Sequence, residues 1–121
     1  MAEGVPLPAR EPGPYWESPG VAADTTPGVE QTLLTFTAPA SGKRRLGAVN
    51  VSCVFDGRFR VTVDGAEVAA GRTGPGGPQA EFRWWPGRPL APSAVVVVKF
   101  KAFIRTPIAT AQAFTHGYDS I

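Results

Sequence analysis

Residues 55–73 read FDGRFRVTVDGAEVAAGRT, and this stretch predicts the fold class. Apolar and polar side chains alternate over residues 58–63, which is the period of a β-strand with one buried face. Asp-Gly pairs stand at residues 56–57 and 64–65, and such pairs favour tight turns between antiparallel strands. The stretch therefore predicts short antiparallel strands that are joined by tight turns.

Loop length decides which side chains share a face of the sheet. A two-residue loop at 64–65 sets Val63 opposite Ala66. It also pairs Thr62 with Glu67 and Val61 with Val68. A three-residue loop at 55–57 keeps the apolar side chains of 45–55 and 58–63 on one face, whereas a two-residue loop would separate them. We therefore expect residues 45–70 to form a three-stranded meander. The side chains expected to be buried together are Val49, Val51, Phe59, Val61, Val63 and Val68.

The rest of the chain also consists of short strand-like runs that are separated by glycine and proline. Its 14 glycines and 13 prolines in 121 residues leave little room for long helices. Further strands are expected at residues 30–37, 80–85, 94–104 and 110–118, each bounded by Gly- or Pro-rich connections. Closely spaced strands without helical periodicity are typical of sandwiches. The sequence predicts an all-β protein, with a single antiparallel β-sandwich or jelly-roll-like domain of about seven strands over residues 30–121.

Residues 1–29 differ from this domain in composition and charge. They contain six prolines, so neither a helix nor a strand ladder is expected, and we predict an extended Pro/Gly-rich N-terminal arm. Residues 1–30 carry five acids and one base, and residues 31–121 carry eleven bases and five acids. An acidic arm on a basic body could dock on a neighbouring copy or protein. The arm's candidate contact residues are Val5, Leu7, Tyr15, Trp16 and Val21.

Residues that could carry catalysis are few. The sequence has no phosphate-binding loop, dinucleotide fingerprint, zinc-protease motif or nucleophile elbow. His116 near Asp119 could be the base half of a triad, but we favour a terminal-strand residue, and Cys53 is expected to be a small buried side chain. Asp56 and Asp64 are interpreted as turn residues rather than calcium ligands. We therefore expect no enzymatic activity, no cofactor and no metal.

Trp84 and Trp85 are the most informative adjacent pair. Neighbouring strand residues point to opposite faces, so we expect Trp84 to share a face with Phe82 while Trp85 points away. An exposed Trp85 beside Arg83 could bind a partner surface or stack on a sugar ring, since aromatic residues and arginine are enriched at interface hot spots. The alternative is that loops or the arm cover both tryptophans.

Other partner classes are not expected. The formal net charge is only +2, so Lys99 and Lys101 are interpreted as a solvated sheet face rather than a nucleic-acid site. The first residues lack a secretory signal, and the longest apolar run, 94–98, is too short to span a membrane. We expect synthesis in the cytoplasm and no membrane partner.

The stretch at 55–73, followed by LAPSAVVVVKFKAF at 90–103, resembles small β-sandwich modules of tailed-bacteriophage virion proteins. The resemblance implies a structural role in the head, neck or tail, as a decoration, collar or tail accessory subunit. The implied partners are other virion proteins and copies of this chain, and the implied location is the virion. The alternative is a glycan-binding or receptor-recognition module that uses an exposed tryptophan. A row of planar aromatics and a calcium site, which such modules carry, are not recognisable in the sequence.

Overall fold

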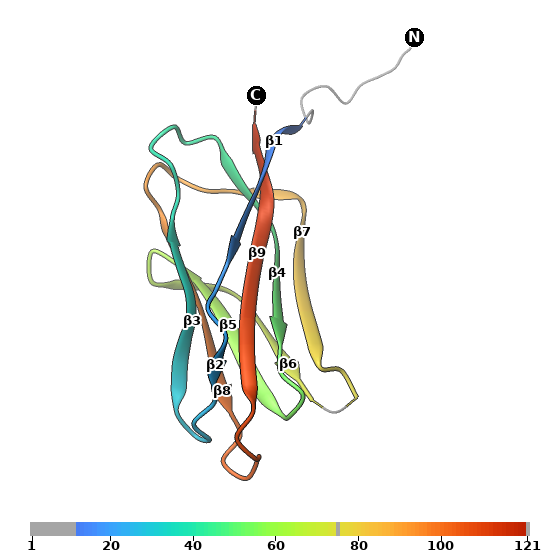
Figure 1. Ribbon diagram of the computed structural model, residues 1–121. Coiled ribbons are helices and arrows are strands. Elements are labelled where there is room, and N and C mark those ends of the chain that lie inside the picture. The colour runs from blue at the N-terminus through green and yellow to red at the C-terminus, as the bar shows by residue number, and fades with distance from the viewer. Residues whose placement is uncertain (1–11, 75, 121) are drawn as a thin grey trace.

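The computed structural model describes residues 12–74 and 76–120, and in this part the chain is an antiparallel β-sandwich (Figure 1). Two sheets pack face to face. One has the order β1-β9-β4-β7 with β2 paired to β9, and the other has the order β3-β8-β5-β6. The strands are β1 (Pro12–Pro19), β2 (Ala23–Asp24), β3 (Glu30–Thr37), β4 (Arg44–Ser52), β5 (Gly57–Val63), β6 (Ala66–Thr73), β7 (Gln79–Pro89), β8 (Val95–Ala102) and β9 (Thr110–Ser120).

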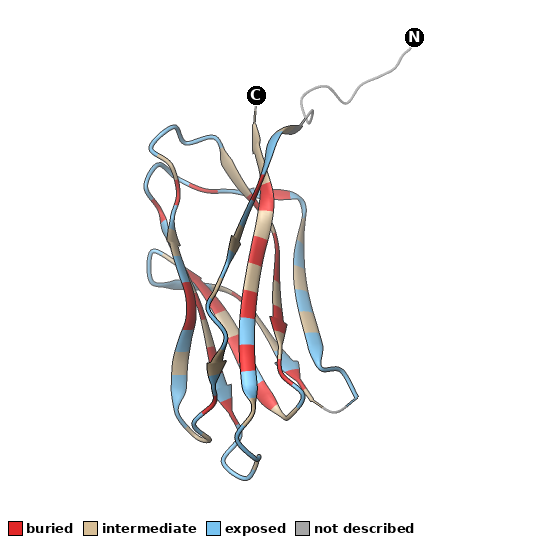
Figure 2. Cartoon of the chain, viewed as in Figure 1, coloured by how far each residue is buried: buried red, intermediate tan, exposed pale blue. Residues whose placement is uncertain are grey.

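The core lies between the two sheets. Alternate side chains on β9 are buried, as Figure 2 shows, and β8 contributes Val96, Val98 and Phe100 to the same interior. Two glycines make room for large rings, because a Cβ on Gly57 would collide with the Phe100 ring. A Cβ on Gly71 would likewise collide with Phe59. The alternation of buried side chains along β8 and β9 is the pattern that a half-buried strand requires.

The predicted fold class and the β5–β6 hairpin are confirmed. Val63 pairs with Ala66 and Thr62 pairs with Glu67 across the turn at 64–65. Asp64 has a φ of +50°, as a tight hairpin turn of this kind demands. A bulge follows, so Val61 lies opposite Ala69. The predicted pairing of Val61 with Val68 is therefore wrong.

The predicted three-stranded meander over 45–70 is wrong. β4 pairs with β7 and β9, whereas β5 pairs with β6 and β8, so the connection at 53–56 passes from one sheet to the other. Val51 and Val61 therefore lie in different sheets, both in the core, instead of side by side in one sheet. Alternation identifies the apolar face of a strand, but it does not identify the neighbouring strand. Of the side chains expected to be buried, Val49, Val51, Phe59 and Val61 are fully buried, while Val63 and Val68 are partly buried against the core.

The predicted separation of residues 1–29 from the domain is wrong for residues 12–29. β1 and β2 both pair with β9, and Thr25 N–H donates to the Ala109 carbonyl oxygen at 2.8 Å. β1 tolerates its prolines because it is an edge strand, which needs donors on one side only, and because its register shifts between Pro12 and Tyr15. The predicted arm residues 1–11, with Val5 and Leu7, lie outside the described residues.

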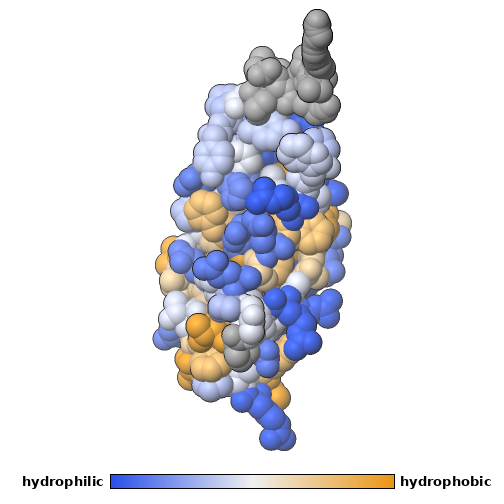
Figure 3. All heavy atoms as spheres, turned by 90° about the vertical axis from the view of Figure 1, so that its right-hand side faces the viewer, coloured by the Kyte–Doolittle hydropathy of each residue, from blue (hydrophilic) through white to orange (hydrophobic). Residues whose placement is uncertain are grey.

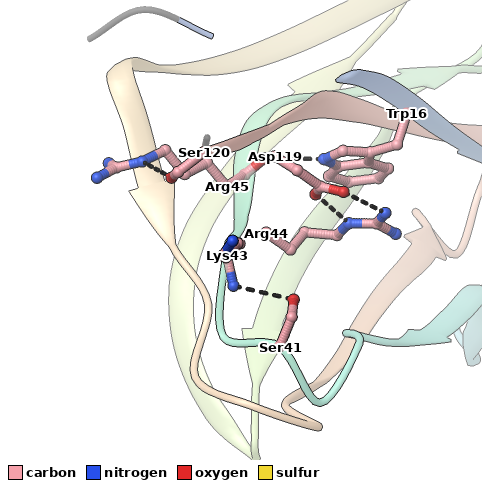
Figure 4. Close-up of polar contacts among 7 residues, drawn as sticks. All are labelled: Trp16, Ser41, Lys43, Arg44, Arg45, Asp119 and Ser120. Atoms are coloured by element: carbon pink, nitrogen blue, oxygen red, sulfur yellow. Dashed lines mark hydrogen bonds and ion pairs between the residues drawn. The ribbon is translucent and has the colours of Figure 1, made fainter. Parts of the chain in front are cut away.

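Trp16 is part of the protein's own core, so its prediction as a partner contact is also wrong. Its side chain is 7% exposed, and its indole N–H donates to the Arg45 carbonyl oxygen at 3.0 Å (Figure 4). The Arg44 guanidinium lies 4.7 Å from the centre of the Trp16 ring and makes two hydrogen bonds, of 2.8 and 3.1 Å, to the Asp119 carboxylate. These contacts lower the pKa of Asp119, chiefly through the hydrogen bonds from Arg44. Trp16 of β1 and Asp119 of β9 are thereby joined to the start of β4.

Candidate functional site

A wide bulge in β7 presents the most exposed aromatic residue of the described chain. Arg83 pairs with Ala48 and Arg88 pairs with Leu46, so residues 84–87 lie opposite the single residue Gly47. The bulge is fixed from two sides. The Tyr118 hydroxyl donates to the Pro86 carbonyl oxygen at 2.8 Å, and the Arg45 guanidinium donates to that of Gly87 at 3.2 Å. Bulges re-aim side chains, and here Trp85 points outward with 89% of its surface exposed.

Beside the bulge lies a cleft of about 330 Å³ on the outer face of the five-stranded sheet. Aromatic side chains surround it, and two glycines form its floor where β4 and β9 approach closely. A Cβ on Gly117 would collide with the Arg45 carbonyl oxygen, and a Cβ on Gly47 would lie 3.2 Å from the Gly117 Cα. The lining residues are Gly13, Tyr15, Gly47, Arg83, Trp84, Trp85, Pro86, His116, Gly117 and Tyr118. We call this the aromatic cleft.

The polar side chains of the aromatic cleft are those of Tyr15, Arg83, His116 and Tyr118. Partial desolvation, and then the neighbouring Glu17 carboxylate, raise the pKa of the Tyr15 phenol, so this hydroxyl keeps its proton at neutral pH. The Arg83 guanidinium is 3.0 Å from the Glu81 carboxylate, and both side chains are well exposed. The Tyr15 and His116 rings lie 6.0 Å apart, centre to centre. The cleft therefore offers planar apolar surfaces with a few hydrogen-bonding groups at the rim, an arrangement typical of ligand sites.

The predictions for the tryptophan pair are confirmed. Trp84 packs against the core with its ring 4.8 Å from that of Phe82, while Trp85 points to solvent. Of the predicted contact residues, the structure brings Tyr15, Arg83 and Trp85 together at the cleft. Val21 is 83% exposed but stands apart, in a shallow groove between residues 19–23 and residues 32–35 of β3.

The sequence-based predictions did not place His116, Tyr118, Gly47 or Gly117 on this surface. Phe114, His116 and Tyr118 stand at alternate positions of β9, which indicates a common face. That signal could have been found in the sequence. The pairing of Tyr15 with Tyr118, which completes the wall, could not, because it needs the contact between β1 and β9.

The side chains considered as candidates for catalysis or metal binding are buried or make contacts that support the fold. Cys53 is buried, as expected. The Asp64 carboxylate accepts from Val95 N–H at 2.9 Å, and His116 lies between the rings of Tyr15 and Phe114. Lys101 pairs with Arg58, and both are exposed on the outer face of the four-stranded sheet.

A second distinctive surface lies at the end of the sandwich opposite the start of β1 and the end of β9 in Figure 1. Five of the nine large apolar side chains exposed by the described residues belong to its connections, 25–29, 53–56 and 103–109, so exposure is concentrated here. A Cβ on Gly28 would lie 3.5 Å from Ile104, and Phe103 N–H donates to the Asp56 carbonyl oxygen at 3.1 Å, so the three connections adjoin. The five residues are Val29, Val54, Phe103, Ile104 and Ile108. We call this surface the loop end.

No protein-family model, curated protein or solved structure matches this chain. The described residues contain no helix with the length and apolar character needed to cross a membrane. On the side of the molecule where β7 lies, Figure 3 shows apolar and polar residues interleaved without one broad apolar patch.

Proposed function

We propose that this chain is a non-enzymatic structural subunit of a tailed-bacteriophage virion, as a head decoration, a collar or neck component or a tail accessory. It would be made in the host cytoplasm and would contact other virion proteins and copies of itself. The virion context rests on the resemblance of residues 55–73 and 90–103 to small virion sandwiches. The assembly role rests on the exposed surface.

The loop end is the observation that carries the assembly role. Ile104 is 78% exposed and Ile108 is 66% exposed, at positions where both could have been polar without loss to the core. Contiguous exposed apolar side chains on a small domain mark contact sites for other proteins. Burying each isoleucine in an interface contributes about 1.5–3 kcal/mol. N-terminal residues 1–11, with Val5 and Leu7, stay predicted contacts.

The test is the mass of the assembly that the full-length protein forms with the products of neighbouring genes. We expect an assembly heavier than one chain, and we expect Ile104→Ser combined with Ile108→Ser to weaken it by at least about tenfold. Val95→Ser is the control, because Val95 is also exposed but lies at the start of β8, the end of that strand away from the loop end. A double variant that assembles like the control would contradict the proposal.

The aromatic cleft supports a second candidate, a glycan-binding or receptor-recognition module. The Trp85 ring is almost fully exposed beside a recess of sugar-ring dimensions with Arg83 at its rim. Planar aromatic rings bind the C–H face of a sugar, while donors at the rim bind its hydroxyls. A saturable change in tryptophan fluorescence on adding a glycan, abolished by Trp85→Ala and kept by Ile104→Ser, would favour this candidate.

A further inference from the structure

Strand β7 lies at one edge of the sandwich (Figure 1), and within the described residues it pairs in the sheet with β4 alone. In an antiparallel ladder, the backbone N–H and C=O groups of alternate residues point to the neighbouring strand. Cys53 N–H donates to the Pro78 carbonyl oxygen at 2.8 Å, in the register of β4 and β7. The backbone groups of the even-numbered residues in 78–82 therefore point to β4. Those of the odd-numbered residues in 79–83 point to the free edge, which is a template for a further strand.

The side chains that β7 turns towards the core are only partly covered. Ala80, Phe82 and Trp84 are partly buried, whereas Val49 and Val51 of the neighbouring β4 are fully buried. The Phe82 and Trp84 rings lie 4.8 Å apart, centre to centre, so the incompletely covered surface is aromatic. The core is therefore open at this edge, and a further strand beside β7 would remove more apolar surface from water.

The sequence along this edge is complementary to itself. Glu81 and Arg83 flank Phe82 and project from the same face of β7, where their side chains pair at 3.0 Å and are 39% and 59% exposed. A two-fold axis through Phe82 sets Glu81 of one copy opposite Arg83 of the other, on both sides of the axis. An axis through Glu81 or through Arg83 would set like charges opposite each other. Opposite charges at facing positions stabilise a pair of strands, and like charges destabilise it.

Two further features favour the axis through Phe82. Glu81 and Arg83 both direct their backbone groups to the free edge, so in this register they meet as hydrogen-bonded pairs. Pro78 and Pro86 stand at equal distances on either side of Phe82, and proline has no N–H to give to a ladder. The segment between the prolines therefore overlaps most fully when Phe82 lies on the axis.

We propose that two copies of this chain pair through their β7 edges, antiparallel about a two-fold axis at Phe82, so that the two five-stranded sheets become one continuous sheet. The two Phe82 side chains form the non-hydrogen-bonded pair on the axis and cover the open edge of the core. Because the contact is isologous, it closes on itself as a dimer. The inference deepens the proposed function and rests on it in one respect, the contact between copies, but it uses a different surface from the loop end.

The test is sedimentation equilibrium of the full-length protein alone at neutral pH, at concentrations up to about 1 mM. We expect a reversible equilibrium between monomer and dimer. Glu81→Arg and Arg83→Glu each set like charges opposite each other on both sides of the axis, so each should weaken the dimer by at least about tenfold. Lys101→Glu is the control, because it reverses an exposed charge on β8, an interior strand of the other sheet, and it should leave the dimer unchanged.

An equimolar mixture of the two single variants is the decisive sample. One variant has arginines on both sides of Phe82 and the other has glutamates, so opposite charges face each other only in the mixed dimer. We expect the mixture to dimerise about as tightly as the unchanged protein. The double variant Glu81→Arg with Arg83→Glu exchanges both signs and should also dimerise as the unchanged protein does. Circular dichroism checks that each variant is folded.

Three results would overturn the inference: a full-length protein that stays monomeric, a dimer that neither single variant weakens, or a mixture that does not restore pairing. The loop end is tested separately, because Ile104→Ser combined with Ile108→Ser should leave this dimer unchanged. A monomeric protein that still assembles through the loop end would overturn the inference and leave the proposed function standing. A dimer that behaves as expected, without any assembly through the loop end, would support the inference and contradict the proposed assembly role.

Discussion

The two sheets of the sandwich share one core but are held in different ways. The five-stranded sheet joins both ends of the described chain to its middle, and side-chain hydrogen bonds fasten it, such as Trp16 to Arg45 and Tyr118 to Pro86. The four-stranded sheet relies on regular alternation, with Val96, Val98 and Phe100 inside and Lys99 between them. Side-chain hydrogen bonds between distant segments are concentrated in the first sheet, whereas the second has chiefly the Arg60–Glu30 pair.

The difference explains where the candidate ligand surface lies. A bulge and a glycine floor interrupt the ladder of the five-stranded sheet, and both would cost stability without tertiary contacts that fix them. Arg45 and Tyr118 supply those contacts to Gly87 and Pro86. Gly87 has a φ of +137°, which glycine adopts more readily than other residues. The outer face of the four-stranded sheet has charged rows instead, with Arg58 between Lys101 and Arg72.

Removal of the N-terminal strands should have the largest effect on the five-stranded sheet. Deleting residues 1–24 removes β1 and β2, strips one edge of β9 and takes Trp16 from the core. We expect a loss in the free energy of unfolding larger than the about 3–5 kcal/mol of a single large core truncation, enough to unfold most of the protein. Urea denaturation followed by circular dichroism measures it. Deleting residues 1–11 keeps every described strand and is the control. A 25–121 chain as stable as the control would contradict the assignment of β1 to the sandwich.

The two contrasting tryptophans give the next largest effect. Trp16→Ala should lower the free energy of unfolding by about 3–5 kcal/mol, because it empties a buried site and leaves the Arg45 carbonyl oxygen without its donor. Trp85→Ala should change it by no more than about 0.5 kcal/mol, since its side chain is 89% exposed. Urea denaturation curves of both variants measure the two changes in the free energy of unfolding. Equal losses would mean that Trp85 is covered.

The ion pairs of the two sheets differ in exposure and should differ in strength. The Arg44 and Asp119 side chains are 20% and 25% exposed, against 38% and 35% for Arg60 and Glu30. We expect Asp119→Asn to lower the free energy of unfolding by about 1 kcal/mol and Glu30→Gln to lower it less, because solvent screens the more exposed pair. Thermal melts of both variants at neutral pH measure the two losses.

The same two ion pairs make the stability of the folded protein depend on pH. Hydrogen bonds from Arg44 and Arg60 lower the folded-state pKa of Asp119 and of Glu30. A lowered folded-state pKa contributes stability above the unfolded-state pKa, about 4, and loses it as the pH falls through the folded-state value. We expect the melting temperature to fall below about pH 4, and to fall less steeply in Asp119→Asn. If the melting temperature of Asp119→Asn fell with pH as steeply as that of the unchanged protein, the Arg44–Asp119 pair would not contribute to this dependence.

The smallest effect concerns the anchor of the bulge. Tyr118→Phe removes the hydrogen bond to the Pro86 carbonyl oxygen, and we expect a loss of about 0.5–1 kcal/mol in the free energy of unfolding. Tyr15→Phe, on the exposed opposite wall, should cost less. If Tyr118→Phe and Tyr15→Phe were equally stable, the hydroxyl of Tyr118 would not be what holds the bulge.

The strands and their apolar faces can be predicted from local sequence patterns. Residues 30–37 were predicted as a strand and form one with the same bounds, and the hairpin at Asp64-Gly65 follows from local turn chemistry. The opposite directions of Trp84 and Trp85 also follow from the sequence, because successive strand residues alternate. These properties depend on neighbours within a few residues, which is the range over which a sequence pattern can be interpreted.

The identity of neighbouring strands and the place of β1 in the sandwich depend on the tertiary structure. The turn at 56–57 could have closed a hairpin, yet it links the two sheets, because β4 pairs with β7 and β9. The proline-rich segment became strand β1 because the edge of β9 supplied its partners and Trp16 found a place in the core. The aromatic cleft is likewise a product of long-range pairing, as Tyr15 and Tyr118 are 103 residues apart in the chain and adjacent in the sheet. Burial and hydrogen bonding across such separations depend on the free energy of the whole chain, which no local pattern contains.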